Sequence, residues 1–260
     1  MGRQRRGRAT RGRLGPWYAL AVVIVKPILT VLTRRRWAGM EHIPARGGAV
    51  VVPNHVSHAD PLTTAHFVYD AGRLPRFLAK SELFGVFFVR SVLRGARQIP
   101  VFRESGTASQ AYRAAVDAVR SGELVVIYPE ATLTRDPGLW PMVGKTGAAR
   151  VALETGAPVI PVAQWGVQDI LPPYAKVPHL LPRHLVQVTA GPPVSLDDLR
   201  GRPIDQDLLR LASERIMAAV TTLLEDLRGE PAPELRFDPR GAALPRTGNP
   251  RRLRTGEEGA

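Results

Sequence analysis

The sequence predicts a single α/β domain with a mostly parallel central sheet flanked by helices, preceded by an N-terminal membrane-associated helical segment. Short apolar runs of strand length alternate with longer segments of helical pattern, which is typical of a parallel sheet covered on both faces. The 260 residues also suffice for one sizeable core. We expect a membrane-associating segment over residues 1–36, the domain over 37–228 and a disordered tail over 229–260, where large apolar residues are few.

The N-terminal segment, residues 1–36, carries ten basic residues, and no acidic residue precedes Glu41, so it holds most of the net charge of +13. Residues 16–33 are apolar except for Lys26, which Pro27 follows. A bilayer-spanning helix needs about 20 apolar residues, so we expect two short interfacial helices hinged at this pair. Arginines near an anionic leaflet contribute about 1 kcal/mol each. These features predict a peripheral or monotopic protein on the cytoplasmic face of the plasma membrane; the alternative is a solvated, disordered tail.

The expected strands are short apolar runs. Residues 48–52 form a β-branched run that Pro53 ends, because proline cannot extend a hydrogen-bond ladder. A second strand, over residues 123–128, ends in the same way at Pro129. Two further apolar runs of strand length follow at residues 158–165 and 185–190.

Capping residues and terminal glycines define the helices between these strands. Asp60 and Pro61 are an N-cap residue and a proline at the first helical position. Gly122 and Gly156 each follow a segment of helical pattern, as expected just beyond a helix C-terminus. Helices are therefore expected over residues 62–69, 107–120 and 145–154, and a long amphipathic one over 204–227.

The clearest indication of chemistry lies between the first strand and its helix, where His55 precedes Asp60 by five positions. Residues five apart do not share a helical face, so these two side chains meet only if the chain turns. In such a loop Asp60 could accept the Nδ1 proton of His55 and leave Nε2 free to take a proton from a hydroxyl. The chain has no cysteine and no G-x-S-x-G motif, so that hydroxyl would belong to a substrate. Alternatively, Asp60 only caps the helix and His55 lies in a polar turn.

Four motifs in order resemble the blocks of the glycerolipid acyltransferases, the family that includes the 1-acylglycerol-3-phosphate acyltransferases. They are Asn54-His55-Val56-Ser57-His58-Ala59-Asp60, Gln98-Ile99-Pro100-Val101-Phe102-Arg103, Tyr128-Pro129-Glu130-Ala131-Thr132 and Ala157-Pro158-Val159-Ile160-Pro161-Val162. The resemblance implies phospholipid biosynthesis by transfer of an acyl group from acyl-CoA or acyl-carrier protein to the free hydroxyl of a lysophosphatidate-like acceptor. It implies no cofactor and no metal.

The same resemblance suggests roles for particular residues. His55 would be the general base and Asp60 its partner, with substrate-binding roles for Asn54, Arg103, Glu130, Thr132 and Lys145. A guanidinium at Arg103 could hold a phosphate through two parallel hydrogen bonds, although a surface arginine is the alternative. Glu130 follows a strand's C-terminal end, where open α/β sheets place ligands; it would bind the acceptor or support the site. Lys145, at a predicted helix N-terminus, is either near the acceptor phosphate or a surface lysine.

The chain departs from the family where a glycine and an arginine usually flank the threonine of the third block. It has Ala131 and Leu133 there, and Arg135 lies two positions too late to be carried over. This departure weakens the case for a phosphate clamp in the loop. The acceptor could therefore be a different lipid or glycolipid.

Other interpretations remain open from the residues alone. Residues 83–89 form either a buried helix or a wall of an acyl-chain tunnel. His55, His58 and Asp60 could bind a metal for hydrolysis, although the spacing differs from the usual zinc-hydrolase motif. The high charge could indicate a nucleic-acid-binding protein. We expect no nucleic-acid partner, because the basic residues are concentrated beside an apolar segment.

Overall fold

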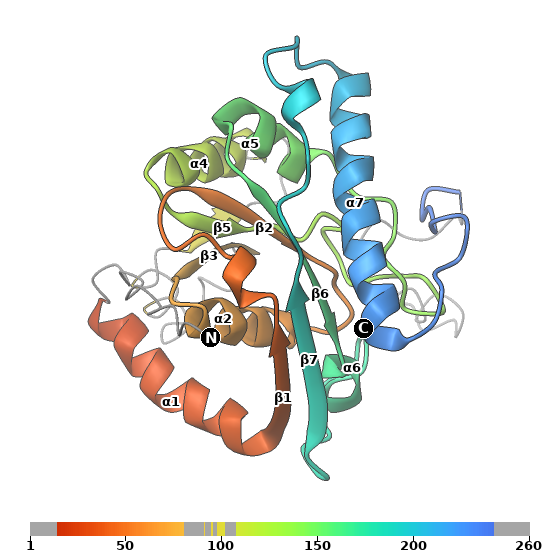
Figure 1. The fold of residues 1–260 in the computed structure, drawn as a ribbon. Helices are drawn as coiled ribbons and strands as arrows, with labels where there is room; N and C mark the ends of the chain where they lie inside the picture. The colour runs from red at the N-terminus through yellow and green to blue at the C-terminus, as the bar shows by residue number, and fades with distance from the viewer. Residues whose placement is uncertain (1–14, 81–90, 92–94, 96–97, 102–107, 242–260) are drawn as a thin grey trace, which may run out of the picture.

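The structure, a computed structural model, describes residues 15–80, 91, 95, 98–101 and 108–241. A seven-stranded sheet with the order β1-β7-β6-β2-β5-β3-β4 runs through its middle (Figure 1). Every neighbouring pair is parallel except β6 and β7. The strands are β1 (Thr33–Ala38), β2 (Ala49–Pro53), β3 (Pro75–Lys80), β4 (Ile99–Val101), β5 (Leu124–Val126), β6 (Val159–Trp165) and β7 (His184–Ala190). The predicted α/β fold with a mostly parallel sheet is confirmed.

The two faces of the sheet are covered by different helices. The helices are α1 (Pro16–Leu32), α2 (Asp60–Asp70), α4 (Ala108–Arg120), α5 (Gly147–Thr155), α6 (Val167–Ile170) and α7 (Gln206–Arg228), with 3-10 turns at Met40–His42 and Asp197–Leu199. Val50 and Val52 of β2 belong to a core shared with α4, α5 and α7, whereas Ala49 and Val51 belong to a second core shared with α2 and α6. All four side chains are fully buried, because alternate residues of a strand face opposite sides of the sheet.

The N-terminal segment differs from the expectation in two ways. Instead of two short helices hinged at Lys26 and Pro27, α1 is one helix with Pro27 inside it. Lys26 does not interrupt the apolar side of this helix, because its Nζ donates to Oδ1 of Asp70 at 2.6 Å. The expected boundary at residue 36 falls inside β1, which pairs with β7 along its whole length. Of the helices that the structure describes, none has the length and apolarity needed to cross a membrane.

The chain beyond α7 is also more ordered than expected. The sequence predicts a disordered tail from residue 229 onward, whereas residues 230–241 lie against the domain. Ala232 N donates to Oε1 of Glu225 at 2.8 Å, and Val143 N donates to the carbonyl of Phe237 at 3.0 Å. Arg236 forms an ion pair with Glu214 of α7. Few apolar residues are needed here, because backbone groups and charged side chains make these contacts.

Candidate active site

The loop between β2 and α2 turns so that His55 meets Asp60. Nδ1 of His55 lies 2.8 Å from Oδ2 of Asp60. The same oxygen accepts the backbone N–H groups of Val56 at 2.6 Å and Ser57 at 2.8 Å. Ala59, not Asp60, occupies the N-cap position of α2. Asp60 therefore does not cap α2, as the alternative had it. Its carboxylate instead points back to the loop, where it binds the backbone of Val56 and Ser57 and the ring of His55.

Burial and hydrogen bonding act in opposite directions on Asp60. Its side chain is fully buried, and burial raises the pKa of the carboxyl, while the hydrogen bond and charge of His55 and the two backbone N–H groups lower it. Oδ1 is buried and has no hydrogen-bond partner among the residues that the structure describes. Because a carboxylate only accepts, Nδ1 of His55 carries the shared proton and Nε2 keeps a free lone pair. The imidazole is 15% exposed, so a small molecule can reach it from solvent.

The ring of Tyr128 packs on the imidazole. The centroids of Tyr128 and His55 are 4.3 Å apart, with 31° between the planes. The phenol oxygen of Tyr128 lies 3.1 Å from Oγ1 of Thr64 in α2, and burial raises the pKa of this tyrosine. Tyr128 therefore restricts the imidazole by packing on its ring, while Asp60 holds it through Nδ1.

Glu130 supports the backbone of this loop. Its Oε1 accepts from His55 N at 2.9 Å, and its Oε2 accepts from Met142 N at 3.0 Å. The carboxyl is 4% exposed; burial raises its pKa to about 8, while the two backbone N–H groups act in the opposite direction. Thr134 N also donates to the carbonyl of His55 at 2.7 Å. Both ends of the His55 backbone are thus tied to the 130–142 loop.

Asn54 lies in a buried bridge between β2 and β6. Its Oδ1 accepts from Gln164 N at 2.8 Å, and its Nδ2 donates to the Gln164 carbonyl at 3.1 Å. Gln164 returns a bond from Nε2 to the Asn54 carbonyl at 3.0 Å and accepts from Oγ1 of Thr63. Asn54 is therefore hydrogen-bonded inside the fold, next to His55. The four motifs did not include Gln164, although a glutamine inside a buried strand is an unusual feature that could have drawn attention to it.

The other predicted binding residues are less closely grouped. Lys145 is exposed and precedes α5, which begins at Gly147; its backbone N–H donates to the carbonyl of Pro129 at 2.8 Å. Thr132 is half-buried, in the turn after Glu130. Arg103 lies outside the described residues, as do residues 83–89.

Comparison with known proteins places this site in a family. A family model described as "Acyltransferase" matches residues 34–165, which include all four motifs and half of the chain. The chain belongs to this acyltransferase family. The resemblance predicted from the four motifs is confirmed.

The chain is similar to curated 1-acyl-sn-glycerol-3-phosphate acyltransferases. It is 33% identical to one from Borreliella burgdorferi over 132 residues, which are 50% of this chain and 51% of that protein. It is 28% identical to one from Bacillus subtilis over 152 residues, 57% of this chain and 71% of that protein. A chloroplastic one from Brassica napus, BAT2, is 27% identical over 52% of this chain and 38% of its own length. The chain thus spans about half, or less, of two of these relatives.

The fold is shared with a solved acyltransferase. The crystal structure of the 1-acyl-sn-glycerophosphate (LPA) acyltransferase PlsC from Thermotoga maritima matches with a TM-score of 0.65 at 24% identity. The match covers 83% of this chain and 81% of that one. At this identity the match shows the shared fold alone.

The departures from the acyltransferase motif have structural consequences. Ala131 adopts φ of 57°, a left-handed conformation that costs a residue with a Cβ roughly 1 kcal/mol and that glycine adopts freely. Leu133 is 2% exposed and belongs to the interior. Arg135 is 8% exposed, and neither its Nε nor its Nη2 has a hydrogen-bond partner within the described part of the chain. Arg135 matches no position of the four motifs, and no sequence pattern predicts its burial.

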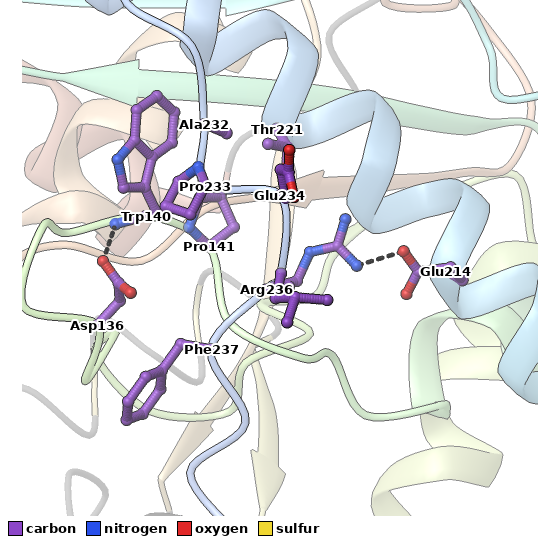
Figure 2. Close-up of a pocket in the computed structure, with 11 residues that line it drawn as sticks. Asp136, Trp140, Pro141, Glu214, Thr221, Ala232, Pro233, Glu234, Arg236 and Phe237 are labelled. Atoms are coloured by element: carbon purple, nitrogen blue, oxygen red, sulfur yellow. Dashed lines mark hydrogen bonds and ion pairs between the residues drawn. The ribbon is translucent and has the colours of Figure 1, made fainter.

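A small cavity lies between the 130–142 loop, α7 and residues 232–237 (Figure 2). Asp136, Trp140 and Pro141 of the loop line it together with α7 and residues 232–237. Its volume is about 90 Å³, below the roughly 300 to 1,000 Å³ of ordinary ligand pockets. Neither His55 nor Glu130 lines it, so it is not the substrate site.

Proposed function

We propose that this acyltransferase moves a fatty acyl group from acyl-CoA or acyl-carrier protein to the free hydroxyl of a lysophosphatidate-like acceptor. The observation that carries the proposal is the hydrogen bond between Nδ1 of His55 and the buried carboxylate of Asp60, in a histidine whose side chain is partly exposed and whose Nε2 has no hydrogen bond to any described residue. The names of the curated relatives support lysophosphatidate as the acceptor. The reaction needs no cofactor besides the acyl donor, and phospholipid synthesis is the expected setting.

The proposed chemistry is direct transfer in one ternary complex. Nε2 of His55 takes the proton of the acceptor hydroxyl as that oxygen attacks the thioester carbonyl. Asp60 stabilises the imidazolium that forms, through a charge-assisted hydrogen bond in a buried setting. The tetrahedral intermediate expels the thiolate, which takes the proton back from the imidazolium. Free CoA or carrier protein and an acylated lipid leave, and the base is regenerated.

Glu130 acts in this scheme as a support rather than as a second base. Both of its oxygens accept backbone N–H groups, those of His55 and Met142. The position of His55 therefore depends on the same carboxyl group that closes the 130–142 loop. Holding the base within hydrogen-bond reach of the acceptor contributes to the rate, because a fixed geometry removes part of the entropic barrier.

We propose that the enzyme works at an anionic membrane surface, peripherally or as a monotopic protein on the cytoplasmic face of the plasma membrane. One side of α1 carries an exposed apolar stripe at helical spacing, made of Leu20, Val23, Ile24, Ile28 and Val31. Such a stripe on the solvent side of a helix is suited to the boundary between headgroups and acyl chains. Arg34, Arg35 and Arg36 follow it directly and are exposed.

A second exposed segment lies beside α1 and would extend the proposed membrane-binding surface. Residues 176–183 are exposed, and Leu181 is 79% exposed. Arg183 donates from Nη2 to the carbonyls of Thr30 and Thr33, so this segment lies beside the end of α1. Because β7 runs antiparallel to β6, its beginning lies at the same end of the sheet as the end of β2, from which His55 follows. A membrane at this end would face the candidate site.

The proposal is tested by an acceptor panel. Purified protein in vesicles is incubated with acyl-CoA, or with an acyl-carrier protein thioester, together with one acceptor at a time. The acceptors are lysophosphatidate, glycerol 3-phosphate, monoacylglycerol and other lysophospholipids, and products are followed by mass spectrometry. We expect phosphatidate from lysophosphatidate, and its loss in His55→Ala. A folded wild-type protein that acylates none of these acceptors with either donor would contradict the proposal. Turnover that a metal chelator abolishes would instead favour a metal-dependent reaction.

A further inference from the structure

Arg228, the last residue of α7, packs against two tryptophans. Its guanidinium carbon lies 3.9 Å from the ring centroid of Trp140 and 4.3 Å from that of Trp165. Nη1 donates to the carbonyl of Gly138 at 2.7 Å, and Nε donates to Oε1 of Glu230 at 2.7 Å, with which Nη2 forms an ion pair. The side chain is only 11% exposed. The charge, the plane and all three nitrogens of this guanidinium are therefore in use.

The residue type suits this position. A cation over an aromatic face is attracted by the ring, and more strongly where water is excluded. A flat guanidinium can stack on a ring and still donate from its edge, which an ammonium group cannot do. Arg215, in the middle of α7, provides a contrast: it donates to Asp198 and to the Ser195 carbonyl but contacts no aromatic ring among the described residues.

The first of the two rings belongs to the loop that holds His55. The carbonyl of Trp140 accepts from Oγ1 of Thr134 at 2.6 Å, and Thr134 N donates to the His55 carbonyl at 2.7 Å. Two positions after the tryptophan, Met142 N donates to Glu130, whose other carboxyl oxygen accepts from His55 N. The loop segment in contact with the arginine is therefore linked to both the N–H and the carbonyl of His55.

The second ring adjoins the other bridge to the same place. Trp165 ends β6 and directly follows Gln164. The backbone of Gln164 binds the side chain of Asn54, and its Nε2 donates to the Asn54 carbonyl. Asn54 directly precedes His55. Two segments distant in sequence thus meet at one guanidinium, and each is linked through a neighbouring residue to the backbone at residues 54–55.

We propose that Arg228 is a positioning residue, which fastens the 130–142 loop to the end of β6 and so fixes the backbone of His55. The clamp consists of Arg228, Gly138, Trp140 and Trp165. The clamp is a property of the fold, and only its effect on turnover rests on the proposed function. A misplacement of about 1 Å far from the chemistry can lower a rate by roughly 10²-fold. Loss of the clamp should therefore lower kcat and leave the binding of substrates largely unchanged.

Hydrogen exchange tests the clamp without an activity assay. Arg228→Met removes the charge, the plane and the donors while keeping an unbranched chain, and Arg215→Met removes the same groups elsewhere on α7 as a matched control. Backbone exchange is followed by mass spectrometry of peptides. In Arg228→Met, exchange over residues 130–142 should be at least about tenfold faster while β2 is unchanged, because a loop can open without unfolding the core. Arg215→Met should leave residues 130–142 at the wild-type rate.

Two exchange results would overturn the proposal. One is wild-type exchange over residues 130–142 in Arg228→Met, which would show that the arginine does not hold the loop. The other is faster exchange spread evenly over the domain, which would indicate a general loss of stability instead of a local opening.

Steady-state kinetics, at a temperature where the variants are folded, show whether the clamp serves catalysis. Arg228→Met should lower kcat about 10- to 100-fold, with KM for acyl-CoA and for lysophosphatidate largely unchanged, whereas Arg215→Met should keep the wild-type kcat. An unchanged kcat in folded Arg228→Met would overturn the positioning role, and so would a higher KM alone, which indicates a role in substrate binding. Faster loop exchange in Arg228→Met, together with a wild-type protein that acylates no acceptor, would reject the proposed function and keep the clamp.

Arg228→Lys covers the case in which Arg228→Met does not fold. Lysine keeps the charge and a donor for Gly138 or Glu230, but it has no planar group to stack on the rings. It should show the same changes in loop exchange and kcat to a smaller degree. Wild-type exchange and kcat in Arg228→Lys would overturn fastening by the stacked guanidinium. Should neither variant fold, Arg228 is a structural residue and the proposal is rejected.

Discussion

Replacing Asp60 by asparagine should remove the negative charge beside His55 while keeping the loop. Oδ2 of Asp60 accepts three N–H groups, those of His55, Val56 and Ser57. An amide oxygen can take that place, and the amide NH₂ group then occupies the position of Oδ1, which has no partner. The backbone donors thus select the amide orientation that keeps the histidine tautomer. What is lost is the carboxylate that stabilises the imidazolium.

The expected effect is large on turnover and small on stability. General-base catalysis typically contributes about 10² to 10⁴-fold to the rate, and His55 depends on Asp60 to stabilise its protonated form. The kcat of Asp60→Asn should therefore fall by a factor in that range, which corresponds to about 3 to 5 kcal/mol in the barrier. The free energy of unfolding should change by no more than about 2 kcal/mol, because one unpartnered polar group replaces another. Turnover is measured with acyl-CoA and lysophosphatidate, and stability by urea unfolding.

Asp136→Asn is the matched control for this substitution. Asp136 also accepts two backbone N–H groups, but it does not contact His55. We expect its turnover to stay near that of wild type. Equal turnover in Asp60→Asn and wild type would refute the assigned role of the carboxylate, and so would an equal loss in both variants.

Three further outcomes follow from the contacts. Because the pKa of Glu130 is raised to about 8, the folded protein keeps a proton that the unfolded chain releases, and the free energy of unfolding should fall as pH rises from about 4.5 to about 8. Glu130→Gln should flatten this pH dependence, measured by urea unfolding at several pH values. An unchanged pH dependence in the variant would contradict the prediction. Val23→Asp and Leu181→Asp should each lower cosedimentation with anionic vesicles by at least about tenfold. Leu211→Asp, on the exposed side of α7, is the control and should not lower it. Equal loss of binding in all three variants would reject α1 and residues 176–183 as the membrane-binding surface. Asn54→Ala leaves the Gln164 backbone groups unpaired and should cost about 2 to 5 kcal/mol of unfolding free energy, and a change below that range in urea would show that the bridge is dispensable.

The core of the site could be predicted because its determinants are local. The β-branched run before Pro53 and the pair Asp60-Pro61 define a strand, a loop and a helix within a short segment. The turn that joins His55 to Asp60 is made by backbone N–H groups of the same loop, so sequence spacing was sufficient. The same reasoning located the buried strands, since continuous apolar runs are typical of strands covered on both faces.

Contacts between distant segments could not be predicted in this way. The bridge between Asn54 and Gln164 joins residues 110 positions apart, and Glu130 reaches His55 across 75 positions. The edge strand β1 carries three consecutive arginines and few apolar residues, so the hydrophobic pattern did not reveal it. The burial of Arg135 depends on how the 130–142 loop folds back, which no local pattern encodes.

Direct transfer with His55 as the base is tested most directly by rapid quench of the enzyme with acyl-CoA, with and without lysophosphatidate. With acceptor, we predict that CoA release equals phosphatidate formation, and that the rate falls about 10² to 10⁴-fold in His55→Ala. Without acceptor, CoA release should stay far below one equivalent per enzyme, and the intact protein mass should be unchanged. A stoichiometric burst of CoA with an acyl group on the protein, or wild-type rates in His55→Ala, would contradict the mechanism.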